Sequence, residues 1–210
     1  MCNSNSTARG ANELGEKIMK RKNFDKIVTA IGFGLTVFLF VAAALLNWGA
    51  TFASDSVKRQ LDNQNISFPV AEGMPEATKA QLAKWAEKKV TTGEMAKDYA
   101  DLYIWEHMKG AAIAAIGKPA TYSEVSGMYM GLVKSGSTDT AQISKLGDLR
   151  QTLFMGNTLR GMLLEAYAFG TLGVIAGYGA IAALVGGVVM LLLSIAGLIH
   201  IRRTPDSATI

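Results

Sequence analysis

The sequence has little charge and almost no cysteine. Only 18% of its 210 residues are Asp, Glu, Lys or Arg, whereas an ordinary soluble domain has about 25%. A single cysteine, Cys2, excludes a disulfide within the chain and a zinc site built on a cysteine cluster. Half of the residues are hydrophobic. Low charge and high hydrophobicity together predict a membrane protein.

The first of two long apolar runs covers residues 27–47. It has about 20 residues without a charge, the length needed to cross a hydrocarbon core of about 30 Å. Basic residues lie before it and none follows until Lys58, so we expect the N-terminal side in the cytoplasm. A cleaved signal peptide is the alternative. Because hydrophobic regions of signal peptides have about 7–15 residues, an uncleaved anchor is the better prediction.

The second apolar run covers residues 166–201 and has no charge between Ala166 and His200. As one helix, those 35 residues would extend about 50 Å, more than the bilayer requires. Part of the helix must therefore tilt or protrude, and residues 172–195 are its expected inner part. Arg202 and Arg203 follow the run and again indicate the cytoplasmic side.

These runs predict an all-α membrane protein in which two transmembrane helices flank an extracytoplasmic helical domain. The expected segments are a cytoplasmic basic tail (1–26), a transmembrane helix (27–47), the extracytoplasmic domain (48–165), a second transmembrane helix (166–201) and a cytoplasmic tail (202–210). The expected location is the plasma membrane, with both termini in the cytoplasm.

Helix signals recur through the middle segment, where no alternation of period two is present. We expect helices at residues 54–65 and 76–90, separated by the extended residues 66–69 that end in a proline. Capping-box patterns at residues 91–94 and 121–124 predict two further helices, the first of which reaches residue 116. A last helix begins near Asp139 and continues into the second apolar run.

The extracytoplasmic domain is small, and we expect it to bury one modest core. Large apolar side chains recur on the predicted helices at helical spacing. The expected core residues are Trp85, Met95, Tyr99, Leu102, Trp105, Met128, Met130, Leu132, Leu149 and Leu153.

Small residues recur four apart in the second apolar run. The pairs are Gly173 and Gly177, Ala176 and Ala180, and Ala183 and Gly187. Such pairs permit close approach of two helices, which matters in lipid because no hydrophobic force drives helices together there. We expect this helix-packing interface to contact another subunit. The alternative is packing on the first apolar run, with Gly32 and Gly34 as the complement.

Charged residues of the middle segment allow two readings each. Arg160 and Glu165 could contact a lipid headgroup or a partner, or could be ordinary interfacial anchors. Glu94, Asp98 and Asp101 share one helix face, where they could bridge a cation. A solvated face compensated by Lys97 is the better interpretation.

The run from Leu149 to Gly170, which leads into the Gly/Ala-rich span, resembles a group of uncharacterised actinobacterial two-span membrane proteins. The segments at residues 59–69, 99–101 and 121–124 are similar to theirs, and the resemblance extends over residues 28–203. It implies the two-span architecture and no established activity. Some of these proteins are labelled aromatic ring-opening dioxygenases.

The residues argue against that label. A non-haem iron dioxygenase needs two histidines and a carboxylate that converge on one iron. The predicted topology separates His107, in the exported domain, from His200, at the inner membrane face. A Gly-x-Ser-x-Gly motif is absent, and Cys2 lies in a polar tail. We therefore expect no enzyme activity, no cofactor and no catalytic metal.

Two functions remain. The first is a non-enzymatic scaffold or accessory subunit of a larger respiratory or cell-envelope membrane complex. The second is a self-associating transport or channel-like module, which the lack of charge inside either span disfavours. The expected partners are membrane lipids and other membrane subunits or further copies of the chain. The net charge of +4 is attributed to loop asymmetry, and no nucleic acid is expected.

Overall fold

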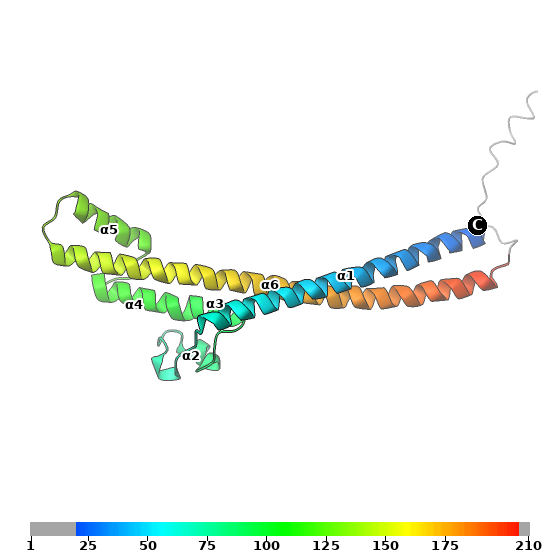
Figure 1. Cartoon of the computed structure of the whole chain (residues 1–210), viewed down its shortest axis with the longest axis horizontal. Coiled ribbons are helices and arrows are strands. Elements are labelled where there is room, and N and C mark those ends of the chain that lie inside the picture. The colour runs from blue at the N-terminus through cyan, green and yellow to red at the C-terminus, as the bar shows by residue number, and fades with distance from the viewer. Residues whose placement is uncertain (1–19, 206–210) are drawn as a thin grey trace, which may run out of the picture. The chain divides into compact units, whose positions relative to one another are not determined.

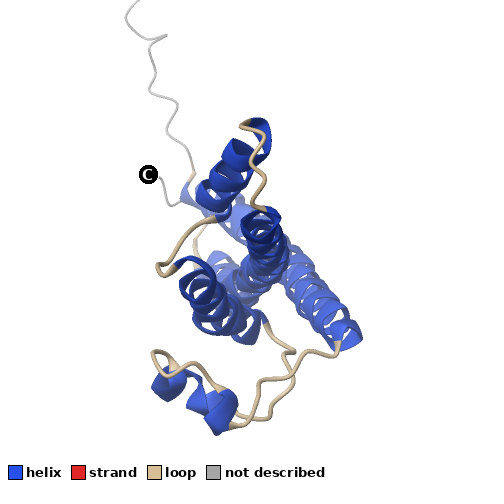
Figure 2. Cartoon of the chain, turned by 90° about the vertical axis from the view of Figure 1, so that its left-hand side faces the viewer, coloured by secondary structure: helices blue, strands red, loops and turns tan. Residues whose placement is uncertain are grey.

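The computed structural model describes residues 20–205, and its regular elements in that range are helices (Figures 1 and 2). Along the chain they are α1 (Arg21–Gln64), η1 (Ala71–Gly73), α2 (Lys79–Leu82), η2 (Ala83–Trp85), α3 (Gly93–Asp98), η3 (Tyr99–Ile104), α4 (Trp105–Ile116), α5 (Tyr122–Lys134) and α6 (Thr140–Arg203). The all-α prediction is confirmed. Cys2, most of the predicted basic tail and residues 206–210 lie outside the described residues.

The chain divides into two compact units. Unit 1 is formed by Met1–Asn47 and Tyr178–Ile210, and unit 2 by Trp48–Gly177. The described part of unit 1 therefore contains the first half of α1 and the last part of α6. All the shorter helices belong to unit 2.

The two helices of unit 1 lie side by side and antiparallel. Thr29 lies near Gly197, Gly32 near Ser194 and Phe40 near Gly187. The residue numbers therefore rise along α1 as those of the facing residues of α6 fall. Each of the two helices is long and apolar enough to cross a membrane. The larger apolar side chains of unit 1 point outward and are exposed, among them Ile31, Val37, Phe38, Val41, Leu45, Ile181, Leu184, Leu192 and Leu193.

Unit 2 has two apolar clusters rather than the single core that the sequence predicted. Cluster A joins α1, α2, α3, η3 and α6 with the loops between α1 and α3, and it includes Val57, Leu61, Phe68, Leu82, Val90, Met95 and Leu163. Cluster B joins α4, α5 and α6, and it consists of Met108, Ala112, Val125, Leu146, Leu149 and Leu153. Eight of the predicted core residues lie in or against these clusters, whereas Met128 and Met130 are exposed on α5.

The predicted helix at residues 76–90 is wrong. Only α2 and the single turn of η2 form there, and residues 88–90 are extended. The amide of Phe68 donates to the carbonyl of Lys88, and the amide of Val90 donates to the carbonyl of Ile66. Glu87 takes a left-handed φ of 59° where the chain turns into this pairing. Pairing with residues 66–68 therefore outweighs the good helix propensity of this segment.

The two predicted capping boxes have different outcomes. At α5 the box forms as expected, because the amide of Thr121 donates to the Glu124 carboxylate and the amide of Glu124 donates to the Thr121 hydroxyl. These hydrogen bonds lower the pKa of Glu124. At α3 the box is wrong, since the cap is Thr92, whose hydroxyl accepts from the amide of Met95.

The predicted helix to residue 116 forms, but its middle is not α-helical. Between α3 and α4, η3 is a six-residue π-helical segment. Gly117, with a φ of 77°, ends α4. The last helix begins at Thr140, as expected from Asp139, and continues without interruption to Arg203.

Candidate functional site

The small residues of α6 within unit 1 face α1 of the same chain. Gly187 is buried, and a β-carbon added there would lie 3.0 Å from the ring of Phe40. Ala180 is also buried, whereas Ala183 is half-buried. The same face receives Gly32, but a side chain at Gly34 would meet open space. The predicted complement on the first run therefore includes Gly32 and not Gly34.

The small residues that belong to unit 2 behave in the same way. A β-carbon added to Gly173 would lie 2.9 Å from the Cβ of Ala53 and 3.3 Å from the carbonyl oxygen of Ala50. At Gly177 the nearest atom, the Cβ of Ala50, would lie at an ordinary 3.8 Å. Ala176 is half-buried. The structure thus brings the predicted interface against α1, the alternative that the sequence left open, and Gly173 makes the closest approach.

Sequence reasoning missed the period of this packing. The buried residues of α6 in unit 1 are seven apart: Ala180, Gly187, Ser194 and Ile201. On α1 the buried Thr29, Thr36 and Ala43 follow the same spacing. A seven-residue repeat keeps one seam of each helix facing its partner in a left-handed supercoil. The seven-residue spacing is present in the sequence, but the predicted pairs of small residues four apart do not include it.

Polar side chains also belong to this seam. Thr29, Thr36 and Ser194 are buried, and Ser194 is only 3% exposed. The Thr36 hydroxyl donates to the carbonyl of Gly32, whereas the Ser194 hydroxyl has no hydrogen-bond partner among the described residues. Ser194 faces Gly32, and Thr29 faces Gly197. At Gly32 and at Gly197, a small polar side chain from the other helix therefore fills the space beside the glycine.

Arg160, predicted as a contact for lipid or a partner, is engaged inside unit 2. Its Nε donates to the carbonyl of Ala100 at 3.0 Å, and its Nη2 donates to the carboxylate of Asp101 at 3.0 Å. Its guanidinium lies 4.6 Å from the ring centroid of Trp105, a cation–π distance. Ala100 and Asp101 belong to the π-helical segment, and Trp105 directly follows it. Arg160 therefore attaches this segment to α6.

A second side chain holds the π-helical segment. The hydroxyl of Thr78 donates to the carbonyl of Leu102 at 2.7 Å, and Thr78 itself is buried. A π-helix is rare, and its backbone carbonyls accept from the amides five residues later. Thr78 and Arg160 supply donors to two of these carbonyls. By contrast, Glu165, the other predicted contact residue, is exposed on α6.

The three acidic residues of the predicted cation-binding face have protein partners. Lys84 pairs with both Glu94 and Asp98 at 3.1 Å, and Asp98 also accepts from the indole of Trp85. These two carboxylates raise the pKa of Lys84, with the hydrogen bond to Asp98 as the larger cause. Asp101 pairs with Arg160 and Lys97. Compensation by basic side chains is therefore confirmed, and it involves more residues than the predicted Lys97.

The two histidines belong to different units. In unit 2, Nδ1 of His107 lies 3.0 Å from the carbonyl oxygen of Tyr103, one turn earlier. In unit 1, Nε2 of His200 lies 3.7 Å from the Asp25 carboxylate. Within residues 20–205, no three His, Cys, Asp or Glu side chains gather in a way that could hold a metal ion. The absence of a catalytic metal stays a prediction.

An exposed apolar stripe runs along the part of α6 that belongs to unit 2. Met155, Leu159 and Met162 follow each other at helical spacing, and Met155 and Met162 are 53% and 60% exposed. Phe154 is exposed beside them. Clusters A and B lie on the other side of the helix, where Leu149, Leu153 and Leu163 are buried. The apolar residues of α6 in this unit thus form two faces, only one of which is covered.

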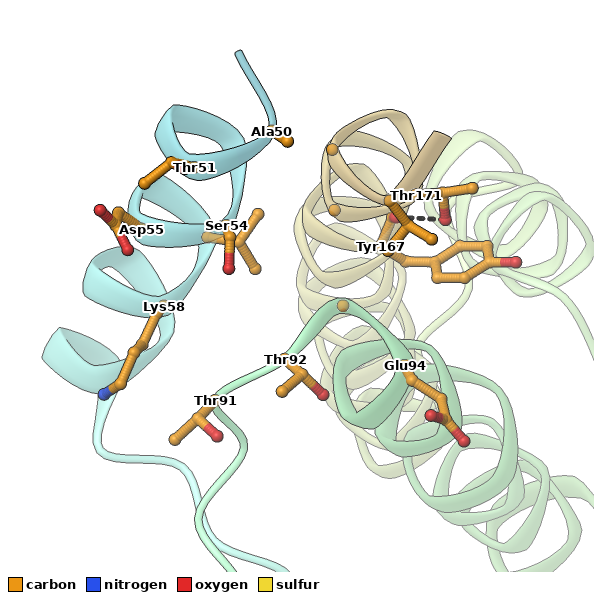
Figure 3. Close-up of a pocket in the computed structure, with 15 residues that line it drawn as sticks. Ala50, Thr51, Ser54, Asp55, Lys58, Thr91, Thr92, Glu94, Tyr167 and Thr171 are labelled. Atoms are coloured by element: carbon orange, nitrogen blue, oxygen red, sulfur yellow. Dashed lines mark hydrogen bonds between the residues drawn. The ribbon is translucent and has the colours of Figure 1, made fainter. Parts of the chain in front are cut away.

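A pocket of about 820 Å³ lies wholly within unit 2 (Figure 3). Three segments form its walls: α1 from Ala50 to Lys58, the start of α3 with the two preceding threonines, and α6 from Tyr167 to Val174. Side chains are scarce where the walls approach each other. A β-carbon on Gly93 would lie 3.1 Å from the Cα of Tyr167, and one on Gly170 would lie 3.5 Å from the Cα of Gly93.

The pocket is polar at its rim and apolar between α1 and α6. Figure 3 shows Asp55 and Lys58 on α1 at one side and Glu94 at the other, with Thr91 and Thr92 on the loop between them. Hydroxyl groups of Thr51, Ser54, Thr91, Thr92 and Thr171 also line it, whereas Ala50, Val57, Gly173 and Val174 provide the apolar wall. No local sequence pattern predicts this site, because its residues come from three distant segments.

No protein-family model matches the chain, and neither a curated protein nor a solved structure matches it significantly.

Proposed function

We propose that this protein is an integral membrane scaffold or accessory subunit without catalytic activity. The main support is the sidedness of unit 1. Its large apolar side chains are exposed, and its small residues face the seam between the two helices. In water such a surface would aggregate, whereas in lipid it is the expected arrangement, since lipid chains are as apolar as leucine.

The proposed topology has both termini in the cytoplasm and unit 2 outside. It is supported by the basic residues that flank the ends of unit 1, such as Arg21, Lys22, Lys26, Arg202 and Arg203. Trp48 and Phe52 stack directly after the first apolar run, and Phe169 contacts Phe52. Aromatic side chains are enriched at membrane–water interfaces. This cluster is therefore the proposed outer boundary.

The proposed docking surface is the exposed stripe of Met155, Leu159 and Met162. Unit 2 would lie in water, where a contiguous exposed apolar stripe is unusual unless a partner covers it. Methionine side chains suit such a surface because they are flexible and polarizable. The packing of Gly173 and Gly187 on α1 leaves this stripe as the better candidate for contact with another subunit. The partner would be a subunit of a respiratory or cell-envelope complex.

Cysteine labelling tests the topology. In a Cys2→Ser background, cysteine at Ala80, which is exposed in unit 2, should react with an impermeant maleimide from outside intact cells. Cysteine at Thr204 should react only after permeabilisation. The reverse pattern, or no membrane association, would overturn the proposed topology.

Native mass spectrometry of gently solubilised complexes tests the docking role. We expect other subunits at fixed stoichiometry, and their loss when Met155, Leu159 and Met162 are all replaced by serine. The matched control replaces three exposed apolar residues of α5, Met128, Met130 and Val133, by serine. If only a homo-oligomer is found, the self-associating transport module is favoured instead. If only a monomer is found, the scaffold proposal fails.

A further inference from the structure

We infer that the pocket between α1, α3 and α6 binds the headgroup of a zwitterionic phospholipid that carries a primary ammonium group, of the phosphatidylethanolamine class. This inference rests on the proposed membrane location. A scaffold role requires no bound ligand, so this ligand site goes beyond the proposed function.

The position of the pocket along α1 suits a headgroup. Ala50 and Ser54 follow Asn47, the last residue of the first apolar run, by about one and two helical turns. The stacked rings of Trp48 and Phe52 belong to the same stretch of α1. If those rings mark the outer interface, the next two turns lie at the depth of the lipid headgroups.

The walls of the pocket suit an amphipathic ligand. Ala50, Gly173 and Val174 form an apolar strip where α1 and α6 touch, and the first part of an acyl chain can lie along its surface. The rim carries hydroxyl groups and three ionisable side chains. Because Gly93 and Gly170 have no side chains, the backbone at the start of α3 lies directly against that of α6 and forms one wall of the pocket. A volume of about 820 Å³ falls within the range of small-molecule pockets.

The charges at the rim select the headgroup. Lys58 forms an ion pair with Asp62, and Glu94 forms one with Lys84. Asp55 has no ion-pair partner among the described residues, so one negative charge remains uncompensated. This charge favours a ligand cation, and Lys58 can still face the phosphate that such a headgroup carries. An anionic headgroup brings no cation to offset the charge of Asp55.

A primary ammonium group fits better than a quaternary one. Its three N–H donors can reach the Asp55 carboxylate together with hydroxyl oxygens such as that of Ser54, which makes no side-chain hydrogen bond within the described chain. A quaternary ammonium has no donor to offer. The pocket should therefore prefer phosphatidylethanolamine to phosphatidylcholine and to phosphatidylglycerol.

Lipid titration monitored by native mass spectrometry tests this preference. Full-length protein in detergent micelles is titrated separately with phosphatidylethanolamine, phosphatidylcholine and phosphatidylglycerol. We expect phosphatidylethanolamine to bind about tenfold more tightly than the other two, because one charged hydrogen bond distinguishes them. Asp55→Asn should abolish that preference, and Ser54→Leu, which fills the pocket, should weaken all three lipids. Asp148→Asn, on the exposed surface of α6, is the control and should bind as the wild type does.

Equal affinity for the three lipids, tighter binding of phosphatidylglycerol, or an unchanged preference in Asp55→Asn would overturn the inference. Asp55→Asn removes only an exposed charge, so it keeps the test decisive even if Ser54→Leu does not fold. The labelling experiment separates the two proposals. A protein that inserts as proposed but shows no lipid preference contradicts the headgroup site alone, whereas one that does not insert contradicts the membrane role itself.

Discussion

The two units bury opposite kinds of side chain. Apart from Ile201, the seam of unit 1 consists of Gly, Ala, Ser and Thr, and most of the leucines, isoleucines and valines point outward. In unit 2 clusters A and B enclose leucine, valine, phenylalanine and methionine, and most charged side chains are at the surface. The difference is the one expected if unit 1 lies in lipid, as proposed, and unit 2 in water. In water, burial of large apolar groups stabilises the folded state. In lipid that driving force is absent, so helices associate through close packing and hydrogen bonds.

The sharpest test of this comparison makes the same substitution in both units. Leu153→Ala, at a residue with 0% exposure in cluster B, should lower the free energy of unfolding by about 2–5 kcal/mol, because it leaves a cavity. Leu192→Ala, at a residue that is 62% exposed in unit 1, should change it by less than about 0.5 kcal/mol in a bilayer. Unfolding in lipid bicelles measures both values. Equal losses would mean that unit 1 is not surrounded by lipid.

The next test removes the polar attachment that is special to unit 2. Arg160→Met keeps an apolar side chain in place but removes the guanidinium donors to the Ala100 carbonyl and to Asp101. The Ala100 carbonyl then keeps only the amide of Trp105, and Asp101 keeps only Lys97. We expect a loss of about 1.5–3 kcal/mol in the free energy of unfolding. Thr78→Val, which removes one uncharged hydrogen bond to the same π-helical segment, should cost about 1 kcal/mol. Unchanged stability in Arg160→Met would instead support the interfacial role that the sequence suggested.

The third test crowds the seam of unit 1. Gly187→Leu should push α1 and α6 apart, since even a β-carbon there lies 3.0 Å from Phe40. Overpacking of this kind costs about 1–3 kcal/mol. The distance between spin labels at Lys26 and Leu198 should increase in the variant. Ala182→Leu, on the exposed face of the same helix, is the matched control and should leave the distance unchanged.

The smallest effect concerns the water-facing cap of α5. The pKa of Glu124 is lowered in the folded protein by hydrogen bonds from Thr121, so its contribution to stability is present above the unfolded value and is lost as the pH falls through the folded value. At pH 7 the Glu124→Gln variant should therefore melt at a slightly lower temperature than the wild type. At pH 3, below the ordinary pKa of a glutamate, the difference between the two melting temperatures should be smaller. A gap of the same size at both pH values would contradict the charged cap.

Local sequence signals predicted the elements whose stability is local. The apolar runs, the capping box at Thr121 and the helix from Asp139 onward depend on neighbours in the chain, and all three are present as helices or caps. The packing of the small residues could also be expected, because glycine in a helix is unfavourable unless it serves a close contact. The spacing of small residues within one helix does not indicate which other helix they contact.

Long-range contacts account for what the sequence did not reveal. The segment at residues 76–90 has good helix formers, yet its pairing with residues 66–68 and the stacking of Trp85 on Phe68 keep most of it out of a helix. Arg160 lies 60 positions from Ala100, so no local pattern indicates their hydrogen bond. Two clusters form instead of one because α6 extends past both α3 and α4, a consequence of its length rather than of its composition.

The π-helical segment sets the phase of the helix in which it lies. The residues that this helix turns toward clusters A and B recur every fourth position: Ala96, Ala100, Ile104, Met108 and Ala112. An ideal α-helix rotates by about 100° per residue, so four such steps would accumulate a drift of about 160° and carry Ala112 to the opposite side. The wider turn from Tyr99 to Ile104 rotates less per residue and cancels part of that drift. In effect this segment holds one surplus residue, and because of it a single helix can keep the same face toward two clusters in succession.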